Sequence, residues 1–254
     1  GLKASRPELS VWVVTGDGDA LSIGGNHFMH VIRRNVDIKY MLFNNRIYGL
    51  TKGQYSPTSE LGKKTKSSPM GSVDYPVDPV KIALGAGATF VARAVDVDAA
   101  GFQKVLSAAA AHKGTAFVEI YQNCNIFNDG AYIQLTEKSS RPQNALYLEH
   151  GKPMRFGPNK EKGIMLDSQG QPMVVDVDEV GEDKLLVHDE TSETLPVVLG
   201  HLRPPDFPTP LGVIRRVQRE SYDALLNEQV ERASERKVTV QQLLNSGETW
   251  TVGG

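Results

Sequence analysis

Two polar clusters follow two apolar runs of the sequence, and their residue types suit the binding of a metal and a phosphate. A Gly-Asp-Gly-Asp string occupies residues 16–19 after one apolar run, and Asn-Asn occupies residues 44–45 after the next. Asn45 follows Asp17 by 28 residues, which is the length of one strand–helix–strand unit. Such a unit would place both side chains at the carboxyl ends of neighbouring parallel strands, where open α/β sheets bind ligands.

The first cluster suits a phosphate only if a cation is also present. Gly16 and Gly18 would let backbone N–H groups approach the phosphate, and the N-terminus of the following helix would attract it. Asp17 and Asp19 would repel a bare diphosphate, so a cation must lie between the carboxylates and the ligand. Mg²⁺ takes about six oxygen ligands, commonly one or two carboxylates together with phosphate oxygens.

The ligand predicted from this pattern is a diphosphate held through Mg²⁺. Asp17, the side-chain oxygen of Asn45 and the Ile47 carbonyl could supply three of the metal's ligands. A dinucleotide-binding turn has a different fingerprint, G-x-G-x-x-G with an acidic residue about 20 residues later. Leu21 stands where the third glycine of that fingerprint would be. A tight strand-to-helix turn without a ligand is the alternative.

Apolar periodicity predicts an α/β fold with a doubly wound, mainly parallel sheet for residues 1–130. We expect strands at 10–15, 38–43, 90–95 and 115–121. We expect helices at 22–34, in a segment that starts at Asp78, and at 99–112. Residues 46–76 have no clear period and are predicted to form a long loop, and a loop of that length inside a domain is usually functional.

The pattern changes after residue 130, where we expect an irregular α+β extension over residues 131–254. Two hairpins are predicted there, one pairing 146–149 with 154–156 and one pairing 164–167 with 173–177. A charged helix is predicted over 219–237. We interpret this extension as an arm that contacts another subunit, rather than as a catalytic module.

Composition narrows the class of protein. The net charge of −2 argues against a nucleic-acid or anionic-membrane partner, and no apolar run reaches the 18 or so residues of a membrane span. A single cysteine excludes an internal disulfide framework and suits a reducing, cytoplasmic compartment. The first residues resemble the last turn of a helix, broken by Pro7, so we expect a further segment upstream of Gly1.

The paired motifs resemble the thiamin-diphosphate-binding motif, and the longer strings sharpen the match. These strings are G-D-G-D-A-L-S-I-G-G-N-H at 16–27 and N-N-R-I-Y-G-L-T-K-G-Q-Y-S-P-T at 44–58. They resemble the β subunit of 2-oxoacid:ferredoxin oxidoreductases, in particular the 2-oxoglutarate branch. The resemblance is strong over residues 10–130 and continues at 148–153 and 208–213.

The resemblance implies a thiamin-diphosphate-binding fold and a set of site residues. Mg²⁺ would be held by Asp17, Asn45 and the Ile47 carbonyl, and the diphosphate would contact the backbone of Gly18 and Asp19. The full set of implied cofactor-binding residues is Gly16, Asp17, Gly18, Asp19, His27, Asn45, Ile47, Gly49, Leu50 and Thr51.

Two further residues have a functional and a structural interpretation. Cys124 corresponds in the resemblance to one of four cysteines that bind a 4Fe-4S cluster, and the other three are expected upstream of Gly1. A lone cysteine is otherwise a small buried hydrophobe. Lys52 could pair with the distal carboxylate of 2-oxoglutarate, which pyruvate lacks; otherwise it is a solvated loop lysine.

The activity implied by the resemblance is the CoA-dependent oxidative decarboxylation of 2-oxoglutarate to succinyl-CoA and CO₂. Electrons would pass through the 4Fe-4S cluster to ferredoxin, and an α subunit would complete an (αβ)₂ assembly. Three alternatives stay open: a subunit specific for pyruvate or another 2-oxoacid, a non-redox thiamin-diphosphate decarboxylase or synthase, and a non-catalytic assembly subunit.

Overall fold

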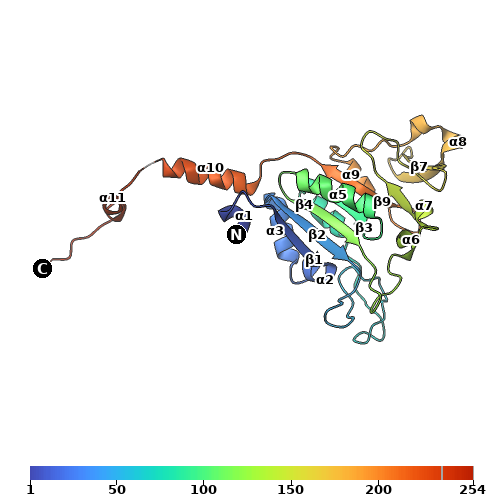
Figure 1. The fold of residues 1–254 in the computed structure, drawn as a ribbon, viewed down its shortest axis with the longest axis horizontal. Helices are drawn as coiled ribbons and strands as arrows, with labels where there is room; N and C mark the ends of the chain where they lie inside the picture. The colour runs from blue at the N-terminus through green and yellow to red at the C-terminus, as the bar shows by residue number, and fades with distance from the viewer. Residues whose placement is uncertain (236, 254) are drawn as a thin grey trace.

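A six-stranded sheet forms the centre of the computed structural model, which describes residues 1–235 and 237–253. The strand order is β1-β2-β4-β3-β9-β5 (Figure 1). The first four strands in this order are parallel: β1 (Val11–Gly16), β2 (Ile38–Asn44), β4 (Ala116–Tyr121) and β3 (Phe90–Val95). The last two come from the C-terminal half: β9 (Thr209–Arg216) runs antiparallel to β3, and β5 (Ala145–Tyr147) runs parallel to β9.

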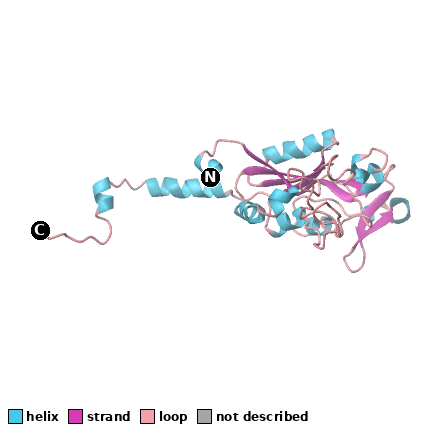
Figure 2. Ribbon diagram, turned by 90° about the horizontal axis from the view of Figure 1, so that it is seen from below, coloured by secondary structure: helices cyan, strands magenta, loops and turns pink. Residues whose placement is uncertain are grey.

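Helices cover both faces of this sheet (Figure 2). The strand β3 shows why, because its side chains alternate between two apolar clusters. Phe90, Ala92 and Ala94 pack in one cluster with α5 (Ala99–Ala111). Val91 belongs to the other cluster, which contains residues of α3 (Gly25–Arg34) and α4 (Pro79–Gly85). The predicted doubly wound, mainly parallel α/β sheet is therefore confirmed.

The helix predicted over 22–34 begins later than expected. A short helix, α2 (Asp17–Leu21), starts directly at the end of β1, and α3 follows it after a turn at Gly24. The Gly24 N–H donates to the Asp19 carbonyl at 2.8 Å, and a Cβ on Gly24 would lie 2.5 Å from that same oxygen. The turn therefore requires glycine at position 24.

The long loop predicted over 46–76 is present, since β2 ends at Asn44 and the next helix, α4, begins at Pro79. As expected for a helix start, Asp78 caps α4 by accepting the Lys81 N–H at 3.1 Å. The loop leaves the carboxyl end of β2 (Figure 1), so it lies at the edge of the sheet where the site was predicted.

One of the two predicted C-terminal hairpins is correct and the other is wrong. The pair β7 (Lys162–Leu166) and β8 (Pro172–Asp176) forms an antiparallel hairpin, and β6 (Arg155–Phe156) pairs with the other side of β7. Residues 146–149 do not pair with 154–156, because β5 pairs with β9 in the central sheet instead. Leu146 is fully buried in that position, so burial favours the long-range pairing over the local one.

The charged helix predicted over 219–237 is present but shorter, as α10 (Tyr222–Ser234); Arg236 lies outside the described residues. The remaining elements are short. They are α1 (Leu2–Ser5), α6 (Ile133–Thr136), α7 (Arg141–Asn144), α8 (Val177–Val180), the 3-10 helix η1 (Glu182–Lys184), α9 (Leu195–Leu199) and α11 (Val240–Leu244). Among the described residues, no helix is long and apolar enough to span a membrane. Figures 1 and 2 show α10 extending away from the sheet. The role of residues 131–254 as a subunit-contact arm stays a prediction.

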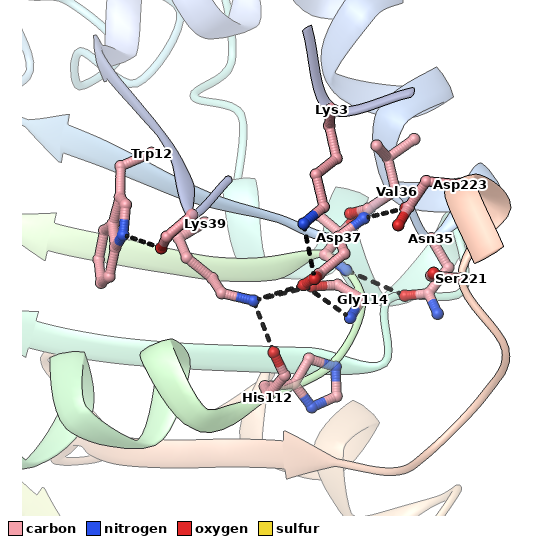
Figure 3. Close-up of polar contacts among 12 residues, drawn as sticks. Lys3, Trp12, Asn35, Val36, Asp37, Lys39, His112, Gly114, Ser221 and Asp223 are labelled. Carbon is pink, nitrogen blue, oxygen red and sulfur yellow. Dashed lines mark hydrogen bonds and ion pairs between the residues drawn. The ribbon is translucent and has the colours of Figure 1, made fainter. Parts of the chain in front are cut away.

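A buried polar cluster at the amino edge of the sheet joins α1 to the start of α10 (Figure 3). The Asp37 carboxylate accepts from Lys39 at 2.8 Å, pairs with Lys3 of α1 at 3.2 Å and accepts the Gly114 N–H at 3.2 Å. The Asp37 N–H donates to Asp223 of α10 at 2.8 Å. Burial would raise the pKa of Asp37, but Lys39, Gly114 and Lys3 outweigh it, so the pKa lies below the usual value. The cluster is remote from the carboxyl edge and has a structural role.

We predict that Asp37→Asn lowers the free energy of unfolding by about 3 kcal/mol at neutral pH, because it leaves two buried lysines without their counter-charge. A carboxylate with a depressed folded-state pKa contributes stability above its unfolded-state pKa of about 3.9 and loses that contribution at lower pH. Urea unfolding of the wild type and the variant should therefore differ by a constant amount down to about pH 4, and the difference should shrink below it. Asp183→Asn, in an exposed ion pair with Lys184, is the control and should leave the unfolding curve unchanged. Equal stability of Asp37→Asn and wild type at pH 7 would contradict the assignment.

Candidate functional site

Asp17 is a buried carboxylate at the junction of β1 and α2. Gly16 ends the strand opposite Phe43 of β2, so the carboxyl ends of the two strands are adjacent, as the spacing predicts. Asp17 is only 1% exposed. Its Oδ2 accepts the Thr58 hydroxyl at 2.6 Å, and its Oδ1 lies 3.4 Å from the Asn45 backbone N–H, which donates to it. Burial raises the pKa of Asp17, and the hydrogen bonds it accepts offset part of that rise.

The structure brings the three predicted metal ligands together. One atom of the Asn45 side-chain amide lies 2.8 Å from the Ile47 carbonyl oxygen and 3.3 Å from Asp17 Oδ1. With nitrogen at that position the amide donates to both oxygens; with its oxygen there, three oxygens converge. Neighbouring oxygens around one octahedral Mg²⁺ lie about 3.0 Å apart, given Mg–O distances of about 2.1 Å. These residues therefore fit Mg²⁺, with one carboxylate and two neutral oxygens. No cluster of three or more His, Cys, Asp or Glu suited to a metal occurs in the described ranges 1–235 and 237–253.

Gly18 has a packing role that the sequence did not reveal. A Cβ at Gly18 would lie 2.2 Å from the Tyr48 ring, and the Tyr48 hydroxyl donates to the Gly18 carbonyl at 3.0 Å. The ring therefore rests on the backbone of the Gly-Asp-Gly turn, and only glycine leaves room for it. Tyr48 was missed because nothing in its local pattern distinguishes it from any other tyrosine in a loop.

The segment from Gly49 to Lys52 forms an exposed tip next to the three oxygens. Tyr48 N–H donates to the Gln54 carbonyl at 2.9 Å and Gly53 N–H donates to the Tyr48 carbonyl at 2.8 Å, which closes the loop behind the tip. Lys52 has a φ of 76°, a conformation that non-glycine residues adopt rarely. Leu50 is 97% exposed, and Thr51 and Lys52 are exposed as well. The loop thus holds Lys52 at the surface in a defined backbone conformation.

Two predicted cofactor residues lie apart from the three oxygens. His27 is exposed in the first turn of α3, and Asp19 is exposed on α2. Within the part of the chain that the structure describes, no hydrogen bond joins either side chain to Asp17, Asn45 or Ile47. Their roles toward a diphosphate stay predictions.

Cys124 lies in a turn that contacts the Asn45 loop. The turn follows β4 and is closed by the Asn128 N–H, which donates to the Cys124 carbonyl at 2.9 Å. Asn128 is 6% exposed, and its side-chain amide donates to the Asn45 carbonyl at 2.8 Å. No local pattern points to Asn128, which joins two segments 83 residues apart.

A polar cavity of about 320 Å³ lies beneath Asn44 and Thr58. On its wall, Tyr132 and Tyr121 stack with ring centroids 4.0 Å apart, between the guanidinium groups of Arg46 and Arg93. Burial raises the pKa of both tyrosines, so they are neutral at physiological pH. The aromatic stack and the two cation–π contacts thus place two neutral rings and two cations on the wall of this cavity.

Comparison with known proteins places the chain in a family. Residues 1–120 match the family model described as thiamine pyrophosphate enzyme, C-terminal TPP binding domain, which defines a thiamin-diphosphate-binding protein. The chain is 48% identical over 259 residues to 2-oxoglutarate oxidoreductase subunit KorB of Mycobacterium tuberculosis, covering 99% of this chain and 69% of that protein. It belongs to the family of β subunits of 2-oxoacid:ferredoxin oxidoreductases.

Other relatives match shorter stretches. 2-Oxoglutarate synthase subunit KorB of Archaeoglobus fulgidus is 46% identical over 124 residues, which cover 49% of this chain and 46% of that protein. A solved structure, 2-oxoglutarate:ferredoxin oxidoreductase from Magnetococcus marinus with 2-oxoglutarate, coenzyme A and succinyl-CoA bound, aligns with a TM-score of 0.75 and 26% identity. That alignment covers 98% of this chain and 71% of the solved chain. The resemblance stated from the motifs is thereby confirmed.

We predict that Gly18→Ala destabilises the protein by about 1–3 kcal/mol, because the new methyl group must displace the Tyr48 ring. Thermal unfolding of Gly18→Ala, Tyr48→Leu and the double variant measures this. The double variant should lose less stability than the sum of the two single losses, since the smaller side chain at position 48 makes room for the methyl group. Strict additivity would show that the contact between Gly18 and Tyr48 does not limit position 18.

Proposed function

We propose that the chain is the cofactor-binding β subunit of a 2-oxoglutarate:ferredoxin oxidoreductase. The observation that carries the proposal is the convergence of Asp17, Asn45 and the Ile47 carbonyl at distances that suit Mg²⁺. The overall reaction takes 2-oxoglutarate, CoA and two oxidised ferredoxins to succinyl-CoA, CO₂, two reduced ferredoxins and a proton. The names of relatives from Mycobacterium tuberculosis and Archaeoglobus fulgidus support the choice of substrate.

The residues of this chain would bind and orient the cofactor. Asp17, Asn45 and Ile47 would hold Mg²⁺, and the backbone of Gly18 and Asp19 would contact the diphosphate at the start of α2. When bound, thiamin diphosphate supplies the carbanion chemistry by which 2-oxoacids lose CO₂. Asp17 contributes the negative charge that a divalent cation requires at this edge, while Asn45 and Ile47 add neutral oxygens. The protein's task is thus to fix one orientation of a charged ligand.

Lys52 is proposed to recognise the distal carboxylate of 2-oxoglutarate. It lies at the exposed tip of the loop that follows Ile47, five residues along the chain from that metal-binding carbonyl. A lysine there offers a point charge that can pair with a carboxylate. Pyruvate has no second carboxylate, so such a contact would favour 2-oxoglutarate.

Cys124 is proposed to supply one thiolate to a 4Fe-4S cluster. It is half-buried, and its turn is joined to the Asn45 loop through Asn128. The sequence contains one cysteine, so this chain alone does not fit a four-thiolate cluster. The other three ligands would have to come from outside these 254 residues.

The proposed partners follow from the subunit assignment. An α subunit would complete the active site in an (αβ)₂ assembly, ferredoxin would accept the electrons, and CoA would accept the acyl group. Residues 131–254 would provide contacts to another subunit, in addition to the two strands they add to the central sheet. The chain spans 69% of its mycobacterial relative and 46% of one archaeal relative, so the activity is proposed for the complete complex.

The test is an assay of the purified complex with a panel of 2-oxoacids and CoA, following reduction of a low-potential acceptor. We expect CoA-dependent turnover with a preference for 2-oxoglutarate. Lys52→Met should lower kcat/KM for 2-oxoglutarate by about tenfold or more and leave pyruvate turnover unchanged, since a hydrogen bond to a charged group contributes about 1.5–3 kcal/mol. Lys64→Met, in the same loop and exposed, is the matched control.

Two outcomes of this assay would contradict the proposal in different ways. Preference of the wild type for pyruvate would overturn the choice of substrate, and an unaltered substrate profile in Lys52→Met would make Lys52 a solvated lysine. A separate analysis of iron and acid-labile sulfide tests the redox chemistry, because their absence from the active complex would favour a non-redox thiamin-diphosphate enzyme.

A further inference from the structure

We propose that Thr58 is a positioning residue for the Asp17 carboxylate, and that its hydroxyl decides which oxygen of Asp17 faces the metal. The inference rests on the proposed Mg²⁺ site and deepens it, because it assigns a role to a residue of the long loop that binds no ligand itself. Thr58 is 41 residues from Asp17 in the sequence and lies in the segment Ser56–Ser59.

The two oxygens of Asp17 have separate partners. Oδ2 accepts the Thr58 hydroxyl at 2.6 Å, in a contact where both side chains are buried. Oδ1 lies 3.3 Å from the Asn45 amide atom that also lies 2.8 Å from the Ile47 carbonyl oxygen. With Oδ2 occupied, the carboxylate presents Oδ1 to the position where the three predicted ligands converge. A carboxylate held in this way would offer one oxygen to a cation.

The Thr58 hydroxyl has one hydrogen and three oxygen neighbours. Its oxygen lies 2.6 Å from Asp17 Oδ2, 2.9 Å from Asn44 Oδ1 and 3.2 Å from the Ser56 hydroxyl, which can donate or accept. The orientation of the Asn44 amide is fixed, because its nitrogen donates to Glu119 at 2.8 Å and its oxygen accepts the Arg46 N–H at 3.2 Å. An ionised carboxylate is the stronger acceptor, so the hydrogen belongs to Asp17 when Asp17 is charged.

A turn of hydroxyl-bearing residues holds Thr58 in this place. The Ser56 N–H donates to the Ser59 hydroxyl at 2.8 Å, and the Ser59 N–H donates to the Ser56 carbonyl at 3.0 Å. The Ser59 hydroxyl also lies 2.6 Å from the Arg46 carbonyl and donates to it. The turn is therefore joined to the same loop that carries Asn45 and Ile47, and the hydroxyl of Thr58 moves with the metal-binding segment.

Removing the hydroxyl should weaken metal binding without removing a ligand. Thr58→Val keeps the shape of the side chain but removes its hydrogen bond to Asp17 Oδ2, so the carboxylate loses a contact that fixes its orientation. Loss of a group that orients a metal ligand typically costs about 10–100-fold in metal affinity. Thr58→Ser retains the hydroxyl and should restore most of that affinity.

The experiment measures the dissociation constant of Mg²⁺ by calorimetry, with the chelator-treated full complex at a saturating concentration of thiamin diphosphate. We expect Thr58→Val to bind Mg²⁺ about 10–100-fold more weakly than the wild type, and Thr58→Ser to bind within about threefold of it. Thr115→Val is the matched control. Thr115 is a second buried threonine, whose hydroxyl donates to the Val36 carbonyl at 2.7 Å at the amino edge of the sheet. It should lower the Tm and leave the Mg²⁺ constant unchanged.

The outcomes separate this inference from the proposed function. If the wild type binds no Mg²⁺, the metal site itself is wrong. If the wild type binds Mg²⁺ and Thr58→Val binds it equally well, the site stands and the positioning role of Thr58 is overturned. If the Thr58→Val complex fails to assemble, Thr58→Cys is measured instead. The cysteine side chain is close in size to that of serine, but its thiol is a weak hydrogen-bond donor. Equal affinity of the cysteine and serine variants would then overturn the role.

Discussion

Burying a carboxylate costs free energy unless hydrogen bonds or a cation compensate its charge, and the carboxyl edge of this protein is arranged around one such group. Asp17 is fully buried at the end of β1, and its burial raises its pKa. Thr58 and the Asn45 backbone supply hydrogen bonds to it, but neither is charged. In the proposed function, Mg²⁺ would supply the missing positive charge.

The two edges of the sheet each contain a largely buried carboxylate, and the two differ in the groups that surround its charge. At the amino edge, Asp37 is compensated within the protein by Lys3 and Lys39, and the result is a buried cluster that joins α1 to α10. At the carboxyl edge, hydroxyl and amide groups surround Asp17, and in the proposed function a bound cation would compensate its charge. The first arrangement contributes to stability, and the second makes the edge suited to bind a cofactor.

The sequence predicted what depends on neighbouring residues and missed what depends on distant ones. Alternating apolar runs predicted the parallel strands, and the Asp17–Asn45 spacing placed two ligands at one edge. The pairing of β5 with β9 was missed because a local pattern does not name its partner across more than 60 residues. The contacts of Tyr48 with Gly18, Thr58 with Asp17 and Asn128 with Asn45 were missed for the same reason. Family resemblance identified the cofactor, while only the structure shows which contacts hold Asp17 and Asn45 in place.

The most direct test of this account is a crystal structure of the complete complex with Mg²⁺ and thiamin diphosphate. The account predicts a cation about 2.1 Å from Asp17 Oδ1, the Asn45 side-chain oxygen and the Ile47 carbonyl oxygen, with the remaining ligands from the diphosphate and water. A cation bound through other residues, or a diphosphate bound at this edge without a cation, would contradict it.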